Sequence, residues 1–194
     1  MPGQLDLHAT AMAEFDRRVR LIDGADWHRP TPCEEWDVRA LVAHLVSEQL
    51  WVPYLLGGGT IAEARGRFGG DVLGSDPLAA WEEASWAART AWLEPGAPER
   101  TVHLSFGDAP GSLYLWQMTF DLAVHAWDLA RGIGADDTLD PGLVRDLVDS
   151  ERFEEEVGSV ARTGGNAGVF APEKSVPNDA GPQQILLART GRTP

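Results

Sequence analysis

The sequence predicts an all-α protein: a four-helix bundle with a short extended segment or hairpin before the fourth helix and extra C-terminal helices. Four segments repeat apolar residues every three or four positions, and Asp, Pro and Gly delimit them. The 194 residues contain no internal repeat and no low-complexity tract. We therefore expect one helical domain over residues 1–194, with a bundle core at about 5–160 and an appendage at about 161–194.

The first two helices are predicted from their apolar faces and their ends. Apolar residues recur at this spacing from Leu5 to Ile22 and again from Val38 to Leu56. Asp37 is a suitable N-cap for the second helix, and the glycines at 57–59 end it.

The third helix begins with Asp76 as cap and Pro77 in the first turn, and continues to about Leu93. Residues 101–106 alternate apolar and polar side chains, which indicates an extended segment. The Gly-Asp-Ala-Pro-Gly stretch at 107–111 is typical of a turn.

The fourth helix is predicted from about Ser112 to Arg131, ending at Gly132. A fifth follows Asp140-Pro141 and covers about 142–157. Residues 162–177 resemble a loop, and a last short helix covers about 181–190 and ends at Gly191.

Composition excludes several classes of protein. The chain has 16 Lys+Arg and 30 Asp+Glu, so its net charge is 16 − 30 = −14, which argues against nucleic-acid binding. No apolar run reaches the roughly 20 residues needed to cross a membrane, and the N-terminus lacks a secretory signal. A single cysteine excludes an intrachain disulfide or a multi-thiolate zinc site. We expect a soluble cytoplasmic protein.

The fourth helix carries the residues most informative about chemistry. Two apolar faces flank a narrow polar stripe of Gln117, Asp121, His125 and Asp128. Asp121 and His125 are four residues apart, so their side chains point the same way and suit two ligands of one metal ion. The spacing alone is weak evidence for a metal, because Asp-x-x-x-His often occurs by chance and is also compatible with a simple hydrogen-bonded pair. Asp128 is a candidate to orient His125.

His44 is a candidate third ligand on the second helix, one turn before Glu48. A histidine at the edge of an apolar stripe is more often a satisfied core residue. Two histidines and a carboxylate would nevertheless form a divalent-metal site with open positions. Cys33 and Trp36 are expected to pack the preceding loop, and Arg131 is a weak candidate for holding a carboxylate.

Three segments resemble a known family. The run TPCEEWDVRALVAHL at 31–45 resembles the signature of the mycothiol-dependent maleylpyruvate isomerase N-terminal domain, within the DinB-like superfamily. DLAVHAWDLARGIG at 121–134 is similar to that family's second metal segment, and the ending ILLARTGRTP resembles the close of an actinobacterial metal-binding subgroup. The resemblance implies a four-helix bundle that holds a divalent metal with His44, Asp121 and His125.

The resemblance also implies a function. We expect a metal-dependent thiol S-transferase or isomerase of the mycothiol type that acts on a small electrophile. The alternative is a non-catalytic metal- or small-ligand-binding protein, and a third interpretation is a structural bundle with no metal. Zinc is the first expectation for the ion because histidine and carboxylate ligands suit it, with nickel, manganese and iron open. The expected partners are a small thiol and an electrophile, without nucleic acid or membrane, and a homodimer is compatible with the fold.

Overall fold

A computed structural model describes residues 3–34, 36–64, 66–158 and 171–194. It confirms the predicted all-α class with a hairpin before the fourth long helix. The elements in chain order are α1 (Gln4–Val19), η1 (Asp26–His28), α2 (Val38–Leu56), α3 (Ile61–Ala64), α4 (Pro77–Trp92), η2 (Ala97–Glu99), β1 (Thr101–Leu104), β2 (Gly107–Pro110), α5 (Gly111–Ile133), α6 (Pro141–Val148), the π-helical η3 (Phe153–Gly158) and α8 (Pro182–Arg189).

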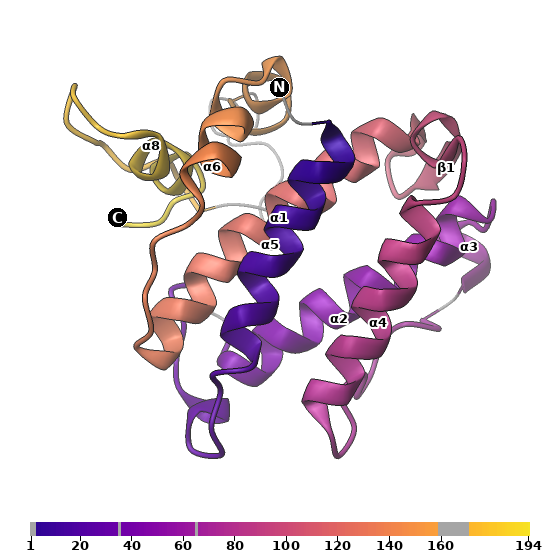
Figure 1. The fold of residues 1–194 in the computed structure, drawn as a ribbon, viewed down its shortest axis with the longest axis horizontal. Helices are drawn as coiled ribbons and strands as arrows, with labels where there is room; N and C mark the ends of the chain where they lie inside the picture. The colour runs from indigo at the N-terminus through magenta and orange to yellow at the C-terminus, as the bar shows by residue number, and fades with distance from the viewer. Residues whose placement is uncertain (1–2, 35, 65, 159–170) are drawn as a thin grey trace. The chain divides into compact units, whose positions relative to one another are not determined.

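Four long helices, α1, α2, α4 and α5, form the bundle as two closely packed pairs. Figure 1 shows α1 running alongside α5, and the most extensive helix contacts join α1 to α5 and α2 to α4. The contact between α2 and α5 is less extensive and joins one pair to the other. The starts of α2 and α4 are as predicted, because the Asp37 and Asp76 carboxylates accept backbone N–H bonds from Ala40 and Ala79.

The core is rich in aromatic side chains. Trp92 from α4 and Tyr114 from α5 are buried among aliphatic residues of α2 and the hairpin. Trp81 is fully buried against Phe15, and its indole N–H donates to Asp16. Burial of such large side chains is a main source of stability in a chain of this size. Within the described residues, no helix combines the length and the apolar character that crossing a membrane requires.

The turn predicted at 107–111 is wrong, because most of this stretch is a strand of the hairpin. Residues 107–110, expected to be a turn, form β2 and pair antiparallel with β1 in the register Thr101 to Pro110 and Leu104 to Gly107. The chain reverses instead at Ser105 and Phe106. Gly and Pro in β2 suggested a turn, but pairing with β1 and burial of Ala109 make the segment extended.

The end of α5 lies two residues beyond the prediction. Gly132, expected to end the helix, is inside α5, where a Cβ would lie 3.1 Å from Val38 Cγ2 and 3.2 Å from Thr31 Cγ2. Glycine at this position permits close approach of the loop before α2. Gly134, with φ of 73°, is the actual left-handed C-cap.

The C-terminal residues form a compact unit of their own. By its internal contacts the chain divides into Met1–Asp137 and Thr138–Pro194. The single domain with an appendage from about 161 stays a prediction. The helix expected over 142–157 is interrupted: α6 ends at Val148, and the π-helical η3 begins at Phe153. Residues 171–177 have no regular structure, and the remainder of the predicted loop, 162–170, lies outside the described residues. The last helix is confirmed as α8, followed by Gly191 with φ of 80°.

Candidate metal centre

The three residues proposed as ligands lie together between α2 and α5. His44 comes from the middle of α2, and Asp121 and His125 come from successive turns of α5. The Asp121 carboxylate bridges the two rings: Oδ2 is 3.2 Å from His44 Nε2, and Oδ1 is 3.3 Å from His125 Nε2. The side chains of His44 and Asp121 are 26% and 30% exposed, whereas that of His125 is 8% exposed, so solvent reaches the cluster mainly at His44 and Asp121.

The donor atoms have the separations that a small divalent ion needs. One ligand atom from each residue lies within 4.8 Å of the other two. Zinc binds nitrogen and oxygen at about 2.0–2.2 Å, so two tetrahedral ligands lie about 3.4 Å apart. The separations of the two imidazole Nε2 atoms from the nearer oxygen of the Asp121 carboxylate, 3.2 and 3.3 Å, are close to that value. The donor set of two imidazoles and one carboxylate suits zinc, nickel, manganese or iron. The residues present therefore fit a divalent ion.

Asp128 fixes the orientation of His125. It is fully buried, and His125 Nδ1 donates to its Oδ2 at 2.9 Å, as the polar stripe had suggested. Because Nδ1 carries that proton, the lone pair of a neutral His125 is on Nε2, the atom that faces Asp121.

The electrostatics of the cluster are strongly coupled. Burial would lower the pKa of His125, but the carboxylates of Asp121 and Asp128 raise it to about 9. Burial favours a neutral Asp121, yet the adjacent His125 and His44 hold the pKa of that carboxyl well below its usual range. The protein without an ion thus contains a charged imidazolium–carboxylate pair, and an ion would take the place of the Nε2 proton.

Trp36 covers the cluster. Its ring centroid lies 4.6 Å from that of His44 and 5.5 Å from that of His125. The loop holds this position because Thr31 Oγ1 donates to the Trp36 carbonyl and the next residue, Asp37, caps α2. The expected packing role of Trp36 thus includes the face of the candidate site.

Glu48 is a polar residue of this region that the sequence did not single out. It is four residues after His44, so it lies on the same side of α2. Burial, followed by the charge of Asp121, raises the pKa of Glu48 to about 7 against the opposing effect of His44 and His125. The spacing from His44 to Glu48 was the available signal, because it matches the spacing from Asp121 to His125.

Cys33 and Arg131, the two other residues considered from the sequence, are not members of the cluster. Cys33 is partly buried in the loop that carries Trp36, in agreement with a packing role. Arg131, considered for holding a carboxylate, forms an ion pair with Asp137 at 3.2 Å and lies over the ring of Trp127. Its side chain is 55% exposed. These contacts account for Arg131 without a ligand.

Comparison with known proteins agrees with this fold. The sequence model of the family described as "Mycothiol maleylpyruvate isomerase N-terminal domain" matches residues 8–130. An uncharacterized protein from each of two strains of Mycobacterium tuberculosis is 32% identical over 191 residues, covering 96% of both chains. Crystal structures of mycothiol-dependent maleylpyruvate isomerase and of a histidine-to-alanine mutant superpose with a TM-score of 0.63 at 21% and 20% identity. They cover 80% of this chain and 70% of theirs.

The family match includes α2 and most of α5, and with them all three clustered residues. The chain belongs to the family of the mycothiol maleylpyruvate isomerase N-terminal domain. The structural likeness to the isomerase itself shows a shared DinB-like all-α fold.

Proposed function

We propose that this protein binds one divalent metal ion through His44, Asp121 and His125 and uses it to activate a small thiol for attack on a small electrophile. The observation that carries the proposal is the convergence of three donor atoms within 4.8 Å of one another from two different helices. The reaction would be thiol transfer or thiol-assisted isomerisation. Zinc is the preferred ion, and the mycothiol-dependent relatives support a thiol of that type as co-substrate.

A bound divalent ion would supply Lewis-acid chemistry, lowering the pKa of a coordinated thiol so that it is nucleophilic at neutral pH. The contribution of the chain is binding and orientation. Asp128 keeps the His125 Nε2 lone pair directed at the site, and the Trp36 ring packs beside both imidazole rings. The partial exposure of His44 and Asp121 leaves a side from which a thiol can approach.

The first test is elemental analysis of the untagged protein. We expect one divalent ion per chain in the wild type and none in His125→Ala. His103→Ala is the matched control, because His103 also pairs with an aspartate, Asp108, at 2.7 Å but lies on the hairpin. Absence of an ion after incubation with zinc or nickel would overturn the proposal.

The second test is metal-dependent turnover. The metal-loaded protein is incubated with mycothiol and a panel of small electrophiles. Thiol consumption, which reports transfer, and conversion of the electrophile to an isomer, which regenerates the thiol, are both followed with and without chelator. Thiol transfer or isomerisation that chelator abolishes and that His125→Ala lacks supports the catalytic proposal. Metal binding without turnover of any electrophile would instead identify a non-catalytic metal-binding protein.

A further inference from the structure

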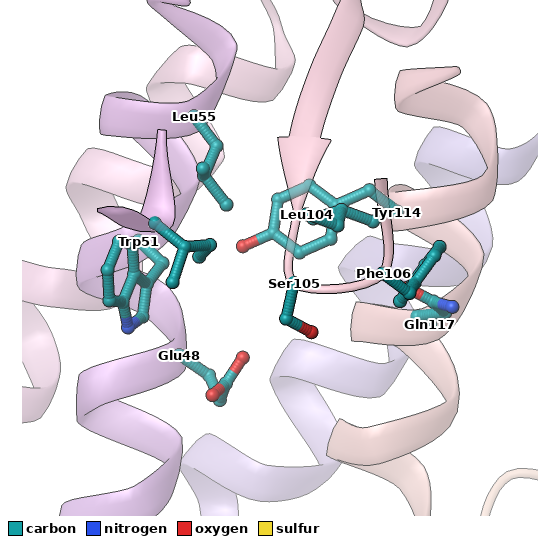
Figure 2. Close-up of a pocket in the computed structure, with 9 residues that line it drawn as sticks. Glu48, Trp51, Leu55, Leu104, Ser105, Phe106, Tyr114 and Gln117 are labelled. Atoms are coloured by element: carbon teal, nitrogen blue, oxygen red, sulfur yellow. The ribbon is translucent and has the colours of Figure 1, made fainter. Parts of the chain in front are cut away.

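A pocket of about 200 Å³ lies between α2, the hairpin and the first turns of α5 (Figure 2). We call it the hairpin pocket. Five of the nine residues that line it are apolar, among them Trp51 and Leu55 from α2, Leu104 from β1 and Ile61 from α3. The carboxylate of Glu48 lies at one end. An apolar pocket with a few polar groups is the usual form of a small-molecule site.

The Tyr114 hydroxyl is an unpartnered polar group in this pocket. The residue is 4% exposed, and its oxygen has no hydrogen-bond partner within the described part of the chain. Figure 2 shows the hydroxyl directed into the space near Leu55. A buried hydroxyl without a partner costs stability, so an acceptor supplied by a ligand would be favourable here.

The hairpin pocket adjoins the candidate metal centre. Glu48 is one turn beyond His44 on α2, and Gln117, which also lines the pocket, is one turn before Asp121 on α5. The two helices therefore lead from the metal ligands directly to the pocket. A molecule in the pocket would lie beside a thiol held at the metal.

The lining of the pocket restricts the charge of its ligand. Among the described residues that form it, none is Arg, Lys or His, and Glu48 contributes a carboxyl group. A carboxylate would lose its hydration there without gaining a cationic partner. An uncharged molecule with an apolar body meets no such penalty.

We infer that the hairpin pocket binds the electrophile of the proposed reaction, and that this electrophile is an uncharged, largely apolar molecule whose carbonyl-type oxygen accepts a hydrogen bond from Tyr114. The inference rests on the proposed function, because it assigns the second substrate of the same centre. Tyr114 is a binding residue in this scheme, and Glu48 disfavours anionic competitors.

The test uses two inert probes of the same shape, benzamide and benzoate, in backbone amide NMR titrations of the metal-loaded protein. We expect benzamide to shift the amides of Trp51, Leu104 and Tyr114, and benzoate to bind at least about tenfold more weakly. Tyr114→Phe should weaken benzamide about five- to tenfold, the effect of one hydrogen bond. Tyr54→Phe is the matched control, because that ring packs on Phe68 outside the pocket lining.

The thermal midpoint of Tyr114→Phe separates binding from a structural role. A hydroxyl without a protein partner predicts a midpoint equal to or above that of the wild type, whereas a lower midpoint would contradict the assignment. Equal affinity of benzoate and benzamide, unchanged benzamide binding in Tyr114→Phe, or shifts confined to other amides would each overturn the inference.

Metal content, measured on the same samples, distinguishes the two proposals. Metal without benzamide binding removes the pocket inference and leaves the proposed function. Benzamide binding without metal overturns the proposed function and, with it, the role of the pocket as an electrophile site.

Discussion

Acidification should destabilise the protein through His8, a histidine remote from the proposed ligands along the chain. Its ring is fully buried on α1, 6.1 Å from the Trp92 ring centroid, and neither ring nitrogen has a hydrogen-bond partner among the described residues. Burial, and then the charge of Arg89, lowers the pKa of His8 from 6.5 to about 3. Between about pH 6.5 and pH 3, His8 is therefore protonated in the unfolded chain but neutral in the folded protein.

The sign and size of the effect follow from proton linkage. Stability is full above pH 6.5 and falls with decreasing pH until about pH 3. The slope is about 1.36 kcal/mol per pH unit, so the 1.5 units between pH 6.5 and pH 5 cost about 2 kcal/mol.

The assay is urea denaturation at pH 7 and pH 5 of the wild type, His8→Phe and His8→Leu. Both variants remove the titrating ring, so the wild type should lose about 2 kcal/mol more than either variant on going to pH 5. His28→Ala, which changes a side chain that is 83% exposed, is the control and should follow the wild type. An equal pH dependence in the wild type and both His8 variants would refute the argument.

Three further outcomes are expected. Asp128→Asn should weaken metal affinity about 10–100-fold in chelator competition, because His125 loses its carboxylate partner, whereas Asp108→Asn on the hairpin should leave it unchanged. Gly111→Ala should lower the free energy of unfolding in urea titrations by about 2–3 kcal/mol, since its Cβ would lie 2.6 Å from a carbonyl oxygen of η2. Glu48→Gln should stabilise the chelator-treated protein more at pH 8 than at pH 5: the raised pKa of Glu48, about 7, means that its stability contribution is present below pH 4.5 and lost as pH rises through 7.

The helices were predictable because their signals are local. Asp37 and Asp76 cap in the structure as their positions in the sequence indicate. The end of α5 was not predictable in the same way, because Gly132 and Gly134 look alike in sequence. Only the neighbours of Gly132 in space show that it permits close packing, and only its φ shows that Gly134 is the cap. β2 was missed for a related reason, since its conformation depends on pairing with β1.

The same difference between local signals and contacts in space applies to the candidate site. The shared direction of Asp121 and His125 follows from four-residue spacing within one helix. No pattern within a single helix could bring His44 to them, because its partner is 77 positions away. The residues alone made His44 only a candidate third ligand, and the family resemblance strengthened its association with the other two. Tyr114 lies three residues before Gln117, on the same face of α5 as the polar stripe, but its unpartnered hydroxyl is visible only once the hairpin and α2 are in place.

The three proposed ligands lie across the contact between α2 and α5, which is less extensive than the contacts within the two helix pairs. This position has a mechanical consequence. α1 with α5, and α2 with α4, form two halves, and His44 belongs to one half while Asp121 and His125 belong to the other. An ion held by all three would act as a cross-link between these halves and would stabilise only the closed arrangement. The stabilisation would grow with the logarithm of the free ion concentration over the dissociation constant. Metal supply would then govern how often the two halves separate, and amide exchange along α2 would report that opening.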